Sequence, residues 1–376
     1  MPDEDFLGHY LQQRQSEDAL RTLRRPAAEQ VDFCSNDYLG LARDMTFQET
    51  IADAVSRHGL SHGSGGSRLL AGNYALAEET EAQIAQFHQA EAALVFNSGY
   101  DANVGLFSSL PHRGDIVLYD RLIHASIRDG IRLSPARAFA FAHNDAAHLE
   151  QRLKKLSGRV FVAVESIYSM DGDRAPLEAI AEVCGRYGAH LIVDEAHATG
   201  VVGDKGEGLV QQLGLQERCL ARVHTFGKAL GVHGAAVTGS RSLRYYLLNF
   251  ARSFIYTTAL PPAAMAGVQL AYNRFPEMRT EREQLSRLMA QFDRAALPCA
   301  HRGALTPIQG IIVPGNAAVK RLATALQSTG MDVRPVLSPT VPAGSERLRV
   351  VLHSFNTLAE VERLTATLQQ YLKTGG

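Results

Sequence analysis

The stretch LIVDEAHATG, residues 191–200, decides the fold. Its apolar run, Leu191–Val193, predicts a buried strand that ends on Asp194, and His197 follows three positions later. A carboxylate at the end of such a strand lies where α/β sheets bind their ligands. Against a pyridine nitrogen, Asp194 would keep that nitrogen protonated, because a nearby negative charge favours the cationic form. Two alternatives stay open: a turn cap beside an ordinary loop histidine, or a metal pair, although no further ligand cluster at metal spacing appears.

Strands and helices alternate around this stretch. The segment from Pro176 to Tyr187 has apolar residues at helical spacing, with Pro176 suited to a first turn and Gly188 to a stop. Alternation over roughly residues 60–240 predicts an α/β fold with a mostly parallel sheet covered by helices. The other predicted strands are Ala93–Phe96, Ile116–Tyr119, Ala138–Ala142 and Val160–Val164.

The C-terminal part has a different pattern. Residues 276–297 are predicted to be largely helical, and strands are predicted at 308–313 and 348–352. A last helix is predicted to begin near Thr357, which can form a capping box with Glu360. We therefore expect an N-terminal arm at 1–45, a large domain at 46–275 and a smaller α+β domain at 276–376.

The bulk composition is that of an ordinary soluble globular protein, with 45% hydrophobic residues, 20% charged residues and a net charge of −1. This charge gives no reason to expect nucleic acid or acidic membrane as a partner. No run approaches the roughly 20 apolar residues of a membrane span. The N-terminal MPDEDFLGHY lacks the features of a signal peptide. The four cysteines form no CxxC pair, so we expect a cytoplasmic location and no cysteine metal site.

A second candidate site is HTFGKALGVHGAA, residues 224–236, in which Lys228 lies among apolar residues and glycines. A lysine forms imines readily only when desolvation or a neighbouring charge lowers its pKa. The glycines would let a planar cofactor approach the backbone, and Thr225 could hydrogen-bond a phosphate. A lysine in an ordinary surface turn is the alternative. The 34 residues between Asp194 and Lys228 (228 − 194) leave room for one helix and one strand, so both can face one crevice.

A third candidate is NSGYDANVGLF, residues 97–107, which follows a predicted strand and opens a helix. Backbone N–H groups at such a helix start, with Ser98 and Gly99, form an anion site, and Tyr100 would offer a ring nearby. A capped helix start without a ligand is the alternative. The glycine-rich GSGGSRLLAG, residues 63–72, matches neither a Walker loop nor GxGxxG, and we interpret it as a loop close to the site.

Two further residues stand alone. His124, in LIHASIRDG, could stack over an aromatic cofactor, and Ser169 lies in ESIYSMDGD. A histidine at a helix start is more often structural, and the same ambiguity holds for Ser169.

Taken together, these segments resemble the α-oxoamine synthases, fold type I enzymes that depend on pyridoxal 5′-phosphate (PLP). Each segment alone is weak, but eight occur in family order over nearly the whole chain. The resemblance implies a mostly parallel seven-stranded sheet sandwiched by helices, and a smaller α+β C-terminal domain. The segments are SNDYLGL at 35–41, GSGGS at 63–67, SGYDAN at 98–103, HASI at 124–127, SMDGD at 169–173, VDEAHATG at 193–200, TFGKALG at 225–231 and VPAGSERLRV at 341–350.

The resemblance implies a role for each candidate residue. Lys228 would bond covalently to PLP and move the substrate proton, and Asp194 would pair with the pyridine nitrogen. His124 would stack on the ring, while His197 and Ser169 would contact its oxygen. The phosphate would be held by Ser98, Gly99, Tyr100 and Thr225, with Thr257 and Thr258 reaching it from a partner subunit, so a homodimer is expected.

The implied reaction joins an amino acid to an acyl thioester with loss of CO₂. Arg349 would hold the amino acid carboxylate as a fork, which a guanidinium does well. Asn36 and Thr340 would lie on the substrate side with His124, as would Arg21, which rests only on DALR at 18–21.

Within the family, four stretches favour the member that joins L-alanine to a pimeloyl thioester, carried on coenzyme A or on acyl carrier protein, in biotin synthesis. Glycine C-acetyltransferase and a non-catalytic PLP-fold subunit stay open as alternatives. Leu337–Ser338–Pro339 replaces the usual arginine–proline–proline, which leaves the acyl side undefined. The four stretches are AHND at 142–145, TFGKALGVHGAAV at 225–237, NFARSFIYTTALPP at 249–262 and SPTVPAGSERLRV at 338–350.

Overall fold

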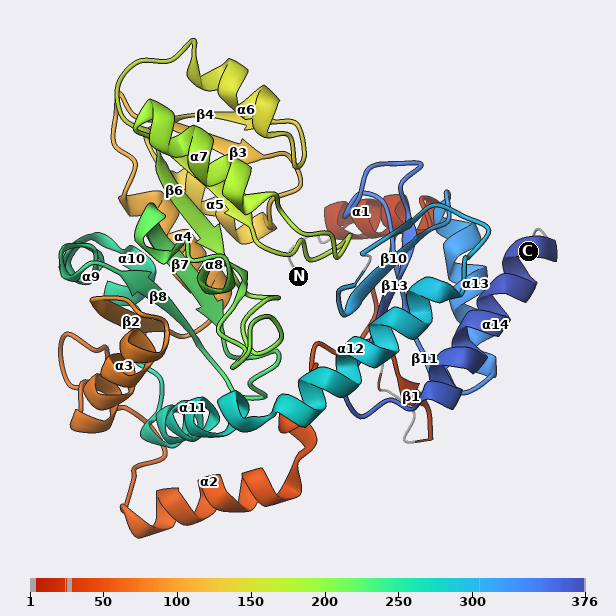
Figure 1. Cartoon of the computed structure of the whole chain (residues 1–376), viewed down its shortest axis with the longest axis horizontal. Helices are drawn as coiled ribbons and strands as arrows, with labels where there is room; N and C mark the ends of the chain where they lie inside the picture. Colours follow the sequence, from red (N-terminus) through yellow and green to blue (C-terminus); the bar gives the residue numbers. More distant parts are fainter. Residues whose placement is uncertain (1–4, 24, 26–28, 304, 375–376) are drawn as a thin grey trace. The chain divides into compact units, whose positions relative to one another are not determined.

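The computed structural model describes residues 5–23, 25, 29–303 and 305–374. The chain divides into two compact units (Figure 1). The large unit comprises Leu39–Ser169 and Arg174–Arg282, and the small unit comprises Met1–Tyr38, Met170–Asp173 and Glu283–Gly376. The arm and domain ranges expected from the sequence, 1–45, 46–275 and 276–376, stay predictions.

The large unit is built on a seven-stranded sheet in the order β2-β8-β7-β6-β5-β3-β4. Strand β8 is antiparallel to both of its neighbours, and the other pairs are parallel. The predicted mostly parallel seven-stranded sheet is therefore confirmed. Its strands are β2 (Ala92–Phe96), β3 (Ile116–Asp120), β4 (Arg137–Phe141), β5 (Val160–Glu165), β6 (His190–Asp194), β7 (Cys219–Thr225) and β8 (Ala235–Gly239).

Helices cover both faces of this sheet. Along β5, Val162 and Val164 pack with α6 and α7, whereas Phe161 and Ala163 pack with α4, α5, α9 and α10. Neighbouring strand residues point to opposite faces, so an uninterrupted apolar run is what a sheet covered on both sides requires. The helices of this unit are α2 (Met45–Arg57), α3 (Ala75–Phe87), α4 (Gly99–Ser109), α5 (Ala125–Leu133), α6 (Ala146–Leu153), α7 (Leu177–Tyr187), α8 (Leu209–Gln212), α9 (Arg241–Phe250), α10 (Arg252–Ile255), α11 (Pro262–Arg274), the first turn of α12 (Arg279–Arg294) and the 3₁₀ turns η1 (Leu41–Arg43), η2 (Gln216–Arg218) and η3 (Phe275–Glu277).

Most predicted elements of this unit have nearly the expected bounds. Helix α7 begins directly after Pro176 and ends at Gly188, whose φ of 64° lies in the left-handed region that glycine adopts without strain. The strand predicted at Ala138–Ala142 lies one residue earlier, at Arg137–Phe141. The helical segment predicted over 276–297 is divided into η3 and α12, because Pro276 lies in the first turn of η3.

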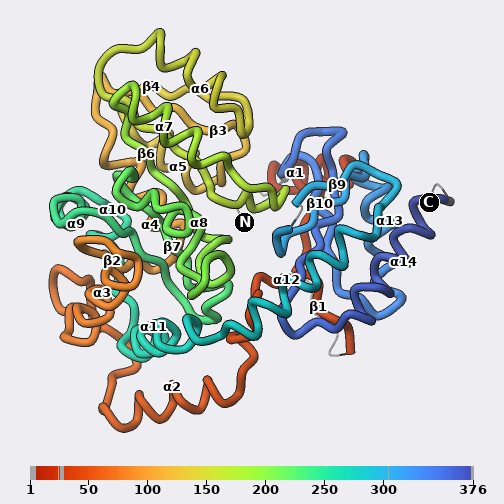
Figure 2. Tube along the Cα trace, viewed as in Figure 1, coloured from red at the N-terminus to blue at the C-terminus, as the bar shows by residue number. Residues whose placement is uncertain are grey.

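The small unit joins both ends of the chain. Val31 and Asp32 of β1 pair in parallel with Met331 and Asp332 of β11 (Figure 2). A second, antiparallel sheet has the order β12-β13-β10-β9. The elements are α1 (Asp5–Ser16), β1 (Val31–Asp32), β9 (His301–Arg302), β10 (Ile308–Ile312), α13 (Asn316–Ser328), β11 (Met331–Asp332), β12 (Arg334–Val336), β13 (Arg347–Val351), α14 (Leu358–Thr374) and the remainder of α12.

The capping box predicted for the last helix is confirmed. The backbone N–H of Thr357 donates to Glu360 Oε2 at 2.7 Å, and the N–H of Glu360 donates to Thr357 Oγ1 at 3.2 Å. Val361, Leu364 and Leu368 on the apolar face of α14 are fully buried. None of the helices in the described part of the chain has the length and apolar character to cross a membrane.

Two buried histidines stack inside the large unit. The rings of His88 and His224 lie 3.6 Å apart and nearly parallel, and both side chains are inaccessible to solvent. His224 bonds Thr199 and Thr238 through its two ring nitrogens, and His88 bonds the Tyr272 hydroxyl. Burial, which disfavours the charged form, lowers the pKa of both histidines well below the ordinary value. Both are therefore neutral in the folded protein.

This pair predicts a loss of stability in mild acid. Below the ordinary histidine pKa of about 6.5, the unfolded chain binds protons that the folded chain refuses, so the unfolding free energy falls as pH falls. Each histidine contributes a slope of up to about 1.4 kcal/mol per pH unit. Urea unfolding over about pH 5 to 7.5 measures this slope, which His88→Phe should reduce. An unchanged slope in His88→Phe would contradict the assignment.

Candidate active site

The two sharpest motifs meet at the ends of neighbouring parallel strands. Asp194 is the last residue of β6, and Thr225 is the last residue of the adjacent β7. Three residues beyond each strand lie His197 and Lys228, whose Nε2 and Nζ are 2.8 Å apart. A lysine ammonium can only donate, so this contact requires either a neutral imidazole acceptor or a neutral amine. The structure thus brings together the lysine and the histidine that were predicted from separate segments.

Asp194 is 6% exposed, and both of its carboxylate oxygens accept hydrogen bonds. Oδ2 accepts from Asn103 Nδ2 at 2.7 Å, and Oδ1 accepts from the backbone N–H of Ala196 at 2.9 Å. Asn103 also donates to the Ser126 hydroxyl at 3.0 Å. Asn103 was not predicted from the sequence. Its usable signal was an amide at an apolar position of the predicted helix, at the end of SGYDAN. These donors orient Asp194.

His124 lies at the start of α5, where its Nδ1 caps the backbone N–H of Ser126 at 3.2 Å. Burial lowers the pKa of His124, against the opposing effect of Asp194. At neutral pH the ring is therefore uncharged, the form suited to stacking on an aromatic cofactor. The structural interpretation of this residue, at a helix start, is confirmed, and its stacking on a cofactor stays a prediction.

Glu165 is a second residue that sequence reasoning missed. It ends β5 as Asp194 ends the neighbouring β6, and it is 3% exposed. Burial, with Asp194 nearby, raises the pKa of Glu165 well above its usual range. Its Oε2 accepts from the backbone N–H of Ser169 at 3.3 Å, which fixes the predicted cofactor residue Ser169. The charged residue that closes VFVAVE was the available signal.

An anion cradle lies at the start of α4. Ser98 caps the helix, its Oγ accepting from the backbone N–H of Asp101 at 3.1 Å. A Cβ added to Gly99 would lie 2.4 Å from Thr225 Oγ1, so this position accepts only glycine beside that hydroxyl. Unpaired N–H groups at a helix start attract phosphate, and the threonine hydroxyl adds a donor. The third candidate here, Tyr100, is 48% exposed and donates its hydroxyl to Asp129 at 2.6 Å.

Within the same chain, Thr257 and Thr258 lie beside Asn97, the residue directly before Ser98. Asn97 Nδ2 donates to Thr257 Oγ1 at 3.0 Å and to the carbonyl of Thr258 at 2.9 Å. Their predicted action on a partner subunit stays a prediction.

The predicted substrate residues pair two by two within the small unit. Arg349, on β13, donates from Nη2 to Asn36 Oδ1 at 2.9 Å, and Arg21 Nη2 donates to Thr340 Oγ1 at 2.9 Å. Tyr38 also donates to Asn36 at 3.2 Å, and burial raises the pKa of Tyr38 to about 12. A guanidinium carries its N–H donors in a planar fork whose geometry matches a carboxylate.

The chemistry of these residues fits PLP. The large unit offers a carboxylate for a pyridinium, an amine for an aldehyde and a helix start with a hydroxyl for a phosphate. Within the described residues, no group of three or more histidine, cysteine or acidic side chains could hold a metal ion.

Comparison with known proteins decides the family. The family model described as aminotransferase class I and II matches residues 28–368. The chain belongs to this family. It is 44% identical to the 8-amino-7-oxononanoate synthase of Emericella nidulans, over 98% of this chain and 96% of that protein. The solved 8-amino-7-oxononanoate synthase of Francisella tularensis is 29% identical, with a TM-score of 0.80 over 93% of this chain and 99% of that chain. Serine palmitoyltransferase from S. paucimobilis, solved with a PLP–myriocin compound bound, is 26% identical, with a TM-score of 0.87 over 98% of this chain and 97% of that chain.

The close approach of Gly99 to Thr225 predicts that the stability of the protein and its affinity for PLP can be changed separately. In Gly99→Ala, the new Cβ meets Thr225 Oγ1, and such overpacking should lower the unfolding free energy by about 1–3 kcal/mol and weaken PLP binding. Adding Thr225→Ala removes the clashing hydroxyl, so the double variant should recover stability without recovering PLP affinity. Thermal unfolding and PLP titration measure the two effects. Wild-type PLP affinity in Gly99→Ala would contradict the cradle.

Proposed function

We propose that this protein is an 8-amino-7-oxononanoate synthase: it condenses L-alanine with a pimeloyl thioester and releases CO₂ and the free thiol. The observation that carries the proposal is the 2.8 Å contact between Lys228 Nζ and His197 Nε2, beside the buried Asp194. The cofactor is PLP. The near-full-length similarity to 8-amino-7-oxononanoate synthases at about 40% identity supports the choice of product.

Bound PLP supplies an electron sink for the bonds broken at the amino acid α-carbon. Lys228 is the proposed covalent attachment point and the base that removes the α-carbon proton of alanine. His197 lies within hydrogen-bonding distance of the lysine nitrogen and orients it. Asp194, held by Asn103 and the Ala196 N–H, keeps the pyridine nitrogen protonated through its negative charge. The neutral His124 ring would stack on the cofactor.

The substrate carboxylate is assigned to Arg349. Its guanidinium would grip the carboxylate with two parallel hydrogen bonds while Asn36 fixes the arginine from the other side. Fixing the carboxylate sets which α-carbon bond is broken, an orientation effect that can contribute several kcal/mol. Asn36, Thr340 and Arg21 complete the proposed substrate side.

A homodimer is part of the proposal. Thr257 and Thr258 would complete the phosphate site of the second subunit. Large apolar side chains are exposed beside the two threonines and in the glycine-rich loop at 63–72: Tyr256 is 72%, Leu70 87% and Leu69 52% exposed. Side chains of this kind favour a protein–protein interface.

A related condensation with another amino acid is the closest competing function. Serine palmitoyltransferases share the fold with TM-scores near 0.88, and fold alone does not select a substrate. Their identity of about 26% is well below the 44% of the Emericella nidulans synthase. The higher identity to the Emericella nidulans synthase favours alanine and the pimeloyl donor as substrates.

Product identification tests the proposal. Purified protein is offered alanine, glycine or serine with pimeloyl-CoA, pimeloyl acyl carrier protein or acetyl-CoA, and products are read by mass spectrometry. We expect 8-amino-7-oxononanoate from alanine with a pimeloyl donor, and turnover at least tenfold slower with the other amino acids, a difference of about 1.4 kcal/mol. Faster turnover of glycine with acetyl-CoA would replace this function by glycine C-acetyltransferase.

A further inference from the structure

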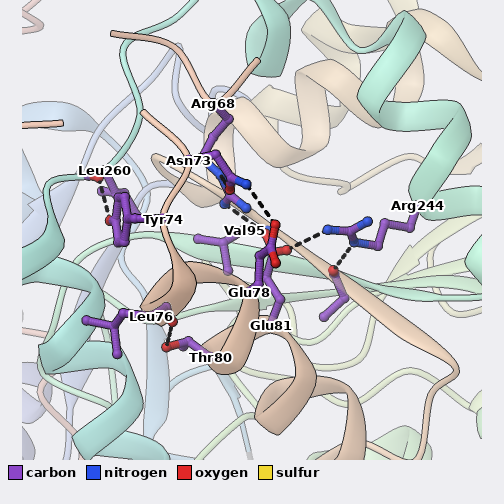
Figure 3. A network of polar contacts seen from close by, with 11 residues as sticks. Arg68, Asn73, Tyr74, Leu76, Glu78, Thr80, Glu81, Val95, Arg244 and Leu260 are labelled. Carbon is purple, nitrogen blue, oxygen red and sulfur yellow. Dashed lines mark hydrogen bonds and ion pairs between the residues drawn. The ribbon is translucent and has the colours of Figure 1, made fainter. Parts of the chain in front are cut away.

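Strand β2 lies at one edge of the large sheet, and side chains cover its outer side. Among the strands that the structure describes, β8 alone pairs with β2. On the open side, the N–H of Val95 donates to Glu81 Oε1 at 3.0 Å, and the carbonyl of Ala93 accepts from Arg244 Nε at 3.1 Å (Figure 3). Two side chains, from α3 and α9, thus take the place of a neighbouring strand.

Glu81 is the centre of this network (Figure 3). Its carboxylate is 3% exposed and forms ion pairs of 2.9 Å with both Arg68 and Arg244. A buried carboxylate is tolerated when charged partners and hydrogen bonds satisfy both oxygens, and removing one partner leaves the charge uncompensated. The position of Arg68 is therefore tightly specified.

Arg68 connects this network to the glycine-rich loop at 63–72. Its Nη1 donates to Glu81 while its Nε donates to Asn73 Oδ1, both at 2.9 Å. The same loop is bonded to Ala259: the N–H of Ala259 donates to the Gly66 carbonyl at 2.9 Å, and its carbonyl accepts from Ser64 Oγ at 3.0 Å. The loop is thus held by Glu81 at Arg68 and by Ala259 at Ser64 and Gly66.

These contacts converge on the phosphate side of the site. Strand β2 continues into Asn97 and the helix start at Ser98, and Asn97 bonds Thr257 and Thr258. Glu81 fixes β2 from its outer edge, and the Arg68 loop fixes the segment that carries the two threonines. Displacing the loop therefore moves Thr257 and Thr258, the groups assigned to the phosphate of the second subunit's cofactor, whereas Asp194 ends β6 and Lys228 follows β7.

We propose that Arg68 is a positioning residue for the phosphate-binding side of the cofactor site, acting through Glu81 and the glycine-rich loop. The proposal rests on the function proposed above, because it takes the cofactor to be PLP. Arg68 does not touch the cofactor in this account. Its loss lowers affinity for PLP, which carries the phosphate, and leaves affinity for pyridoxal, which lacks it, unchanged.

The test compares both compounds on the apo-protein. Arg68→Lys keeps a positive charge beside Glu81, so the variant should fold. The lysine cannot reach Glu81 and Asn73 at once, so one of the two contacts is lost. Dissociation constants for PLP and pyridoxal are measured by absorbance titration. We expect the PLP constant to rise about tenfold, as for a displaced binding group, with the pyridoxal constant within about twofold of wild type. Arg68→Met should give a larger PLP effect.

Arg159→Lys is the matched control, because Arg159 pairs with another buried carboxylate, Asp115, outside the network of Glu81 and the glycine-rich loop. Its ratio of PLP to pyridoxal affinity should equal that of wild type. An equal change of the ratio in both variants, or equal loss of both ligands in Arg68→Lys, would assign Arg68 to general stability and overturn the proposal. Failure of the wild-type protein to bind either compound would instead overturn the proposed function.

Discussion

The account depends on one constraint: an amine, an imidazole and a carboxylate must be held together where two parallel strands end. Strands β6 and β7 lie side by side, so the residues that follow them meet without long loops. The 2.8 Å contact between Lys228 and His197 is the direct result. Asp194 and His197 are buried there, which is costly for a charged group unless it is paired. Asn103 pairs with Asp194, and burial lowers the pKa of His124 and so favours its neutral form.

Polar groups in the layer behind the site follow the same rule. The stacked pair His88 and His224 is neutral and bonded to hydroxyls, and Glu81 is satisfied by two guanidinium groups and a backbone N–H. A buried network whose polar groups are paired, as those of Glu81 are, defines one arrangement of the surrounding chain, because a displacement leaves a buried polar group without its partner. Glu81 connects the open edge of the sheet to a glycine-rich loop, so rigidity at the edge extends to the proposed phosphate side.

The sequence predicted the sheet, α7 and the last helix, and it singled out Lys228 and His197, whose side chains the structure brings together. It succeeded where the signal was local: a buried apolar run that ends on a charged residue, or a cap followed by a glutamate. It did not reveal Asn103, Glu165 or Glu81, because their partners lie far away in the chain and a lone polar residue in an apolar segment does not name its partner. Strand β7 had no predicted bounds, since Arg222 and His224 interrupt its apolar run. The pairing of Arg349 with Asn36 brings together residues 313 positions apart, which no spacing rule predicts.

The most direct measurement is to identify the lysine that carries the cofactor. Borohydride reduction of the PLP-loaded protein fixes the cofactor to its lysine, and peptide mass spectrometry then locates the added mass. The account predicts modification of Lys228 and none of Lys154, Lys155, Lys205, Lys320 or Lys373. Modification of another lysine, or retention of PLP with no lysine modified, would contradict it.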